Sequence, residues 1–185
     1  MDIIVKYIDE LLEKSTPDAP VWNIEKIRQG LKSNWNYIDG VMIKAVLQMY
    51  DVTKDEKYLK FADNFIDYRV HEDGTIDGYS IGEKNIDNVN AGKTLFELYD
   101  LTGKEKYRKA IDLVYSQIEI MPRCNNEARS FWHKDIYPNQ VWLDGMYMGQ
   151  PFYLEYETKF NNRKNYPDIF AQFKYVIENM KNPLN

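Results

Sequence analysis

Apolar residues recur at three- and four-residue spacing along most of the chain, which is the periodicity of amphipathic helices. The first such stretch covers residues 2–14, and the prolines at positions 17 and 20 end it. A mixed stretch follows, with at most a short helical turn. Further helices are predicted at residues 36–51, 54–70, 87–101, 104–120, 141–157 and 166–180. No segment alternates in the way of a strand, so the fold class is predicted to be all-α.

Part of this pattern is an internal repeat. Residues 47–63 (LQMYDVTKDEKYLKFAD) recur 49 residues further along as residues 96–112 (FELYDLTGKEKYRKAID), and a weaker third copy runs from residue 156 to 166. Each centre holds a threonine followed three residues later by a glutamate, which is the pattern of a capping box. We therefore expect Thr53 and Thr102 to cap the second helix of an αα-hairpin.

Hairpins repeated at this interval predict a curved array of helix pairs. The array is either an open solenoid or a closed ring, the α/α toroid. The chain has 185 residues, of which 44% are hydrophobic, which is enough for one domain with a single hydrophobic core. We predict a single helical domain over residues 1–185.

The two long predicted connections, residues 71–86 and 121–140, lie opposite the short turns. Polar residues also open the first helix of each hairpin, eleven or twelve residues before the repeated tyrosine: Asp39, Asn88 and Asp144. This spacing is roughly 17 Å along a helix, which puts all three residues at the end with the long connections. Such loops on a rigid scaffold commonly carry binding groups. The repeat thus predicts a polar cluster at one mouth of the array.

Composition and charge narrow the classes of function. A net charge of -5 argues against a nucleic-acid partner. Cys124 is the single cysteine, so no internal disulfide forms, and neither a signal peptide nor a membrane segment is evident. We therefore expect a cytoplasmic protein with no membrane partner. Zinc-site, serine-hydrolase and P-loop patterns are also missing from the sequence.

The candidate chemical groups each have a structural alternative. Asp144 stands in a predicted first helical turn, where a carboxylate complements the helix dipole. If Asp87 met it at the pocket mouth, the two carboxylates would form a tuned acid pair. His133 is either a solvated loop residue or a hydrogen-bond donor beside Lys134, which would attract an anionic ligand. Aromatic residues of the same stretch either stack on a sugar or belong to the core, among them Phe131, Trp132, Trp142 and Tyr147.

Four stretches resemble a known family: residues 35–40 (WNYIDG), 86–93 (IDNVNAGK), 131–134 (FWHK) and 142–152 (WLDGMYMGQPF). In this order they resemble the unsaturated rhamnogalacturonyl hydrolases of glycoside hydrolase family 105. The unsaturated glucuronyl hydrolases of family 88 are related. The resemblance implies a six-hairpin (α/α)6 toroid, of which this chain would form the amino-terminal half.

The resemblance also implies a function in pectin degradation. The substrate would be a rhamnogalacturonan-derived oligosaccharide with a 4,5-unsaturated galacturonate at its non-reducing end, and the enzyme would hydrate the C4=C5 vinyl ether. The general acid/base falls on Asp144 and the assisting carboxylate on Asp87. Tyr37, His133 and Lys134 fall on substrate-contacting positions, and we add Trp142 and Tyr147 as aromatic substrate-binding residues. No metal or organic cofactor is expected.

The chain is about half as long as the family members that it resembles. A half ring exposes apolar sides of its inner helices, so we expect self-association or a partner that supplies the second half. The alternative function is a non-catalytic helical-repeat module that binds a sugar or a protein. If the chain is an enzyme, substrates of the family 88 type are the nearest alternative to those of family 105.

Overall fold

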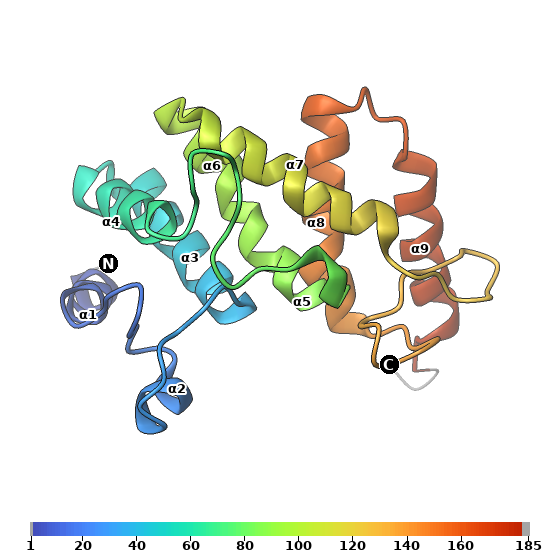
Figure 1. The fold of residues 1–185 in the computed structure, drawn as a ribbon, viewed down its shortest axis with the longest axis horizontal. Helices are drawn as coiled ribbons and strands as arrows, with labels where there is room; N and C mark the ends of the chain where they lie inside the picture. The colour runs from blue at the N-terminus through green and yellow to red at the C-terminus, as the bar shows by residue number, and fades with distance from the viewer. Residues whose placement is uncertain (1, 183–185) are drawn as a thin grey trace.

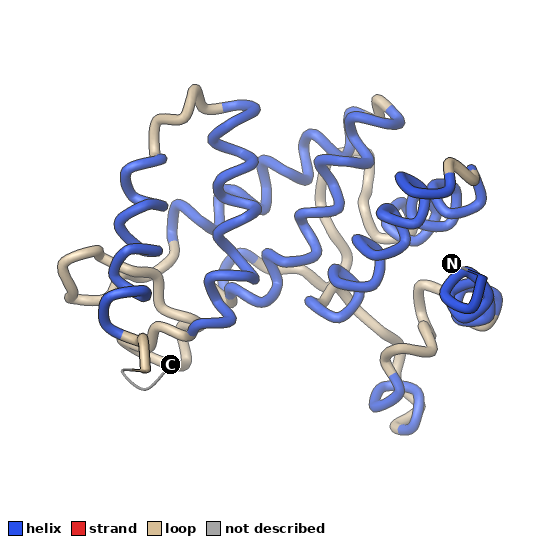
Figure 2. The backbone as a smooth tube through the Cα atoms, turned by 180° about the vertical axis from the view of Figure 1, so that it is seen from behind, coloured by secondary structure: helices blue, strands red, loops and turns tan. Residues whose placement is uncertain are grey.

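The computed structural model describes residues 2–182, and this part of the chain contains helices and loops but no strands (Figures 1 and 2). The all-α prediction is therefore confirmed. None of these helices is long and apolar enough to cross a membrane. In chain order the elements are α1 (Asp2–Glu13), α2 (Ile24–Arg28), α3 (Tyr37–Thr53), α4 (Glu56–Asp67), η1 (Ile81–Glu83), α5 (Ile86–Val89), η2 (Asn90–Gly92), α6 (Lys93–Thr102), α7 (Glu105–Ile120), α8 (Leu143–Phe160) and α9 (Tyr166–Asn179).

Three hairpins follow one another after α1: α3 with α4, α6 with α7, and α8 with α9. Figure 1 shows them in sequence order, with α1 and α9 at opposite ends of the molecule. The helix predicted at residues 87–101 is three consecutive pieces, since the 3-10 turn η2 separates α5 from α6. There α3 passes so closely that a Cβ atom on Gly40 would lie 2.6 Å from the Cα atom of Ala91.

The short turns confirm the hairpins but not the predicted capping boxes. Thr53 and Thr102 are the last residues of α3 and α6, and their hydroxyls donate to carbonyls four residues earlier, at 2.7 and 2.6 Å. A left-handed residue follows each threonine, Lys54 at φ 56° and Gly103 at φ 67°. The threonines therefore end the first helix instead of starting the second. The prediction was wrong because a hydroxyl can also bond within the preceding helical turn.

The repeated glutamates instead bridge the two helices of a hairpin. Glu56 accepts a hydrogen bond from the Tyr50 hydroxyl at 3.3 Å, and Glu105 accepts one from the Tyr99 hydroxyl at 3.4 Å. The same tyrosine–glutamate pair thus spans both turns. The repeated glutamates therefore have a structural role, but this role is to connect the two helices and not to cap the second one.

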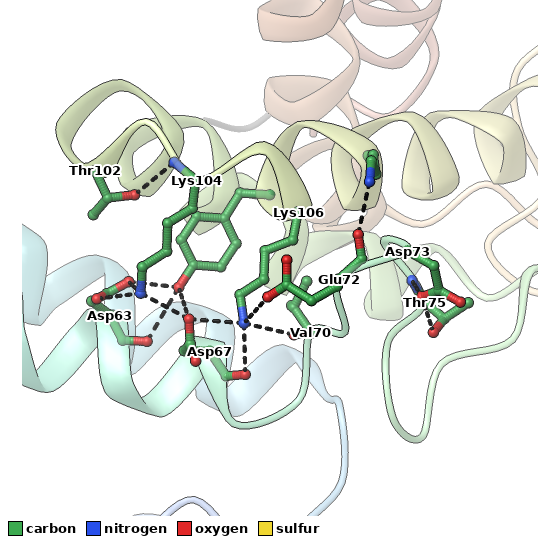
Figure 3. A network of polar contacts seen from close by, with 11 residues as sticks. Asp63, Asp67, Val70, Glu72, Asp73, Thr75, Thr102, Lys104 and Lys106 are labelled. Atoms are coloured by element: carbon green, nitrogen blue, oxygen red, sulfur yellow. Dashed lines mark hydrogen bonds and ion pairs between the residues drawn. The ribbon is translucent and has the colours of Figure 1, made fainter.

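A second set of repeated residues connects α4 to α1 and α7 to α4. The hydroxyl of buried Tyr58 on α4 donates to Asp9 of α1 at 2.9 Å, and that of buried Tyr107 on α7 donates to Asp63 of α4 at 2.6 Å. Lys104 adds an ion pair to Asp63 at 2.7 Å (Figure 3). The α4–α1 contact is thus equivalent to the α7–α4 contact. Because α4 is the second helix of its hairpin, α1 takes the position of the second helix of a preceding hairpin.

The third hairpin has a longer turn, which is organised by the fully buried Glu157 of α8. Its carboxylate accepts hydrogen bonds from the Tyr115 hydroxyl at 2.7 Å, the Asn165 backbone at 2.9 Å and the Asn161 amide at 2.9 Å. Burial acts to raise the pKa of Glu157, but these hydrogen bonds outweigh it and hold the pKa below its usual value. The carboxylate therefore joins α7, α8 and the turn.

Candidate active site

Two loop segments pair to bring Asp87 beside His133 and Lys134. The Ile86 backbone N–H donates to the His133 carbonyl at 3.1 Å, and Asn85 forms an isolated antiparallel bridge with Lys134. Asn85 also caps α5, because its side chain accepts from the Asp87 backbone N–H at 3.1 Å. The local backbone pairing therefore fixes Asp87 at the first turn of α5, next to the loop that precedes α8.

Glycines on α8 allow α5 and the loop that precedes α8 to pack closely against this helix. A Cβ atom on Gly145 would lie 3.1 Å from Nδ1 of His133, and one on Gly149 would lie 2.9 Å from Cδ1 of Ile86. Both glycines thus face the contact with α5, at the edge of the molecule where α5 and the start of α8 meet in Figure 1. This packing sets Asp144, the residue before Gly145, against His133.

Four of the residues singled out in the sequence converge here. Nζ of Lys134 lies 2.7 Å from Oδ2 of Asp87, and Nε2 of His133 lies 3.3 Å from Oδ1 of Asp87. On its other side, Nδ1 of His133 lies 4.0 Å from Oδ1 of Asp144. One ligand atom each from Asp87, His133 and Asp144 fits within 4.8 Å of the others. The imidazole thus lies between two carboxylates.

Burial differs sharply across this cluster. His133 is 2% exposed and Asp87 is 8% exposed, whereas the Asp144 side chain is 51% exposed. Burial lowers the pKa of His133, against the opposing charges of Asp87 and Asp144, so the ring is neutral near pH 7. Asp144 is therefore the member of the cluster that meets solvent.

Aromatic rings cover one side of the cluster. The Trp142 ring stacks on the His133 ring with centroids 4.1 Å apart and planes at 7°, and Tyr137 stacks on Trp142 at 5.3 Å. Trp142 and Tyr147 are 38% and 52% exposed. Both predicted aromatic residues therefore lie at the surface beside Asp144, not in the core.

Two other expectations for the mouth are not met, those for Asp39 and Asn88. Asp39 is buried and accepts hydrogen bonds from Trp22 Nε1 and Asn36 Nδ2 at 2.8 Å each, so it anchors the start of α3. Asn88 donates to Glu83 at 3.0 Å, away from the carboxylate pair. The Tyr37 carbonyl accepts from the Asn90 amide at 2.9 Å and its ring is half exposed, so the substrate contact of Tyr37 stays a prediction. The equivalent positions of the repeat lie at the same end of their helices, but their side chains have different partners because distant segments pack against them differently.

Sequence reasoning assigned no role to Lys93, although it ends the quoted stretch at residues 86–93. Lys93 is 9% exposed, and its Nζ lies 3.2 Å from the Tyr147 carbonyl oxygen and 3.8 Å from the centroid of the Tyr147 ring. Burial, with the charge of Lys44, lowers the pKa of Lys93 to about 8. The available signal was a charged residue shortly before the apolar residues Leu95 and Phe96 of a predicted helix.

The carboxylate–imidazole set has the donor types of a divalent cation site. However, the ammonium of Lys134 already lies 2.7 Å from Asp87 and neutralises it. A cation there would have to displace that ion pair, so the described residues fit acid–base chemistry better than metal binding.

Comparisons with known proteins agree with this arrangement. The family model of Glycosyl Hydrolase Family 88 matches residues 8–185. A solved glycoside hydrolase from family 105 of C. acetobutylicum ATCC 824 is 43% identical, with a TM-score of 0.78 over 85% of this chain and 44% of that one. The chain thus spans less than half the length of this relative, and its hairpins form half of an (α/α)6 toroid. From the family match over nearly its whole length, the chain belongs to glycosyl hydrolase family 88.

Proposed function

We propose that this chain carries the acid–base centre of a hydrolase that hydrates the C4=C5 bond of 4,5-unsaturated galacturonyl oligosaccharides. The observation that carries the proposal is the cluster of Asp87, His133 and Asp144, whose ligand atoms lie within 4.8 Å of one another in a glycosyl hydrolase family member. Asp144 is the solvent-facing carboxyl group of this set and therefore meets the substrate.

In the proposed reaction Asp144 donates its proton to C4, and the ring oxygen stabilises the resulting cation at C5. Water adds to C5, and the Asp144 carboxylate takes the proton that water releases. The hemiketal opens, and the neighbouring sugar leaves as an alcohol. A single carboxyl group thus acts first as an acid and then as a base, which is an efficient use of one side chain.

The surrounding residues support this division of roles. Asp87 is buried and ion-paired, so its negative charge is fixed near the developing cation. Lys134 holds Asp87 in place, which leaves less of its positive charge for a substrate carboxylate than the sequence suggested. Tyr147 is 52% exposed and offers an aromatic surface on which a sugar ring can stack, whereas Trp142 already stacks on His133 and Tyr137.

The test is the loss of the unsaturated-uronate absorbance with an unsaturated rhamnogalacturonyl disaccharide, and a glucuronyl disaccharide as the rival substrate. Asp144→Asn should lower kcat about 10²- to 10⁴-fold, because it removes the acid and base. Asp135→Asn is the matched control, since this aspartate lies in the loop that precedes α8 and its side chain is 48% exposed. Equal rates for the Asp144→Asn variant and the parent would overturn the assignment of Asp144.

A second candidate is a module that binds the sugar without turnover. The observation that favours it is the open mouth, where the Asp144 side chain is 51% exposed in a chain that spans 44% of its solved relative. Calorimetry with the same disaccharide separates the two candidates. Binding heat with no absorbance loss at any protein concentration supports the module and contradicts the enzyme.

A further inference from the structure

Helix α8 runs through Pro151 without a break. Proline has no backbone N–H, so the carbonyl four residues earlier loses its usual helical donor. That carbonyl belongs to Tyr147, and Nζ of Lys93 lies 3.2 Å from its oxygen. A side chain of α6 therefore donates to the acceptor that Pro151 leaves without its usual partner.

The setting of Lys93 shows that this contact is specific. The side chain is almost fully buried, and it makes no ion pair with a carboxylate in the described part of the chain. Its nearest partners are the Tyr147 carbonyl and the face of the Tyr147 ring, 3.8 Å from Nζ. Burying an ammonium group costs free energy unless hydrogen bonds and cation–π contacts offset it. Both kinds of contact come from Tyr147.

Tyr147 follows Asp144 by three residues, so the two are neighbours on the surface of α8. We propose that Lys93 is a positioning residue for Asp144: by replacing the missing N–H of Pro151, it fixes the first turn of α8 against α6. The glycine contacts hold the opposite side of this turn, where Gly145 meets His133. The activity part of this inference rests on the proposed function, whereas the contact itself does not.

A double-mutant cycle in urea unfolding tests the contact without any assay of activity. Lys93→Met should lower the unfolding midpoint, because it removes the donor to Tyr147. Pro151→Ala restores a backbone N–H, so Lys93→Met should lower the midpoint less in that background. Equal losses in both backgrounds would overturn the coupling. Lys93→Leu, which also removes the donor, serves if Lys93→Met does not fold.

Lys106→Met is the matched control, since this lysine is also 9% exposed and donates to a backbone carbonyl, that of Val70 at 3.0 Å. Its effect should be the same with Pro151 and with Pro151→Ala. A coupling as large as that of Lys93 would mean that the cycle reports general loosening of α8.

Two readouts then separate positioning from mere stability. The NMR resonances of the His133 ring are sensitive to the position of Asp144, whose Oδ1 lies 4.0 Å from Nδ1 of His133. These resonances should shift in the Lys93→Met variant and return towards their parent values when Pro151→Ala is added. With the disaccharide, Lys93→Met should lower kcat about 10- to 100-fold with KM little changed, and Pro151→Ala should restore part of it. Unmoved His133 resonances would overturn the proposal. An inactive parent would contradict the proposed function alone, because the urea and NMR results still decide the role of Lys93.

Discussion

The two histidines of the chain have opposite environments. Burial lowers the pKa of His133, whereas the hydrogen bond from exposed His71 to Asp77 at 2.8 Å raises the pKa of His71. In an NMR pH titration we expect His71 to titrate above pH 6.5 and His133 below it. Asp87→Asn should lower the pKa of His133 further, since it removes the largest opposing charge.

Asp77→Asn is the control for this titration, and it should lower the pKa of His71 alone. The reverse order of the two histidines would contradict the burial of the His133 ring. The sign for stability follows from the lowered pKa: the neutral ring stabilises the fold above about pH 6.5, and this contribution is lost as pH falls through the folded-state pKa.

The turn between α8 and α9 depends on the buried carboxylate of Glu157. Because its hydrogen bonds outweigh burial and lower its pKa, its contribution is present above the unfolded-state pKa of about 4.3 and is lost as pH falls. Glu157→Gln should lower the free energy of unfolding by about 1–3 kcal/mol at pH 7. Urea unfolding at pH 7 and pH 4 should show a smaller loss at the lower pH.

Asp51→Asn gives the comparison, because Asp51 holds the equivalent repeat position but its side chain is 60% exposed. We expect a change within about 0.5 kcal/mol at both pH values. If Glu157→Gln lowered the free energy of unfolding as little as Asp51→Asn, the asparagines would hold the turn without the carboxylate.

Apolar side chains gather at the two ends of the array. On α9 a stripe at helical spacing is exposed, with Phe170 at 70% and Ile177 at 65%, and α1 exposes Ile3 at 81% at the opposite end (Figure 1). The first helices of the hairpins also expose apolar residues, as expected for half a ring, such as Leu143 of α8 at 64%. Exposed stripes of this kind favour association between copies. A preparation of these 185 residues should therefore show a mass that rises with concentration in sedimentation velocity.

Phe170→Lys combined with Ile177→Lys should hold the mass at that of a monomer. Val52→Lys is the matched control, because Val52 is 64% exposed but lies on α3, away from both ends. A monomer at every concentration for the parent chain would contradict self-association through α9.

Local sequence determined the helices and the hairpins. Apolar periodicity and the repeated turn are properties of neighbouring residues, and the structure places α3, α4, α7, α8 and α9 within a few residues of the predicted ranges. The close approach of helices at Gly40 and Gly145, where a Cβ atom would crowd its neighbours, is seen only in the structure. Helix ends and caps were less certain, because one threonine hydroxyl can bond on either side of a turn.

The tertiary structure decided which aspartates can act. Asp39 and Asp144 each stand before a glycine in the first turn of a helix, so their local sequences are alike. Packing buries Asp39 against Trp22 and leaves Asp144 half exposed beside His133. The same holds for Lys93, whose partner lies 54 residues away on α8. Burial, charge and hydrogen bonds at these positions depend on residues distant in the chain, and only the folded molecule brings them together.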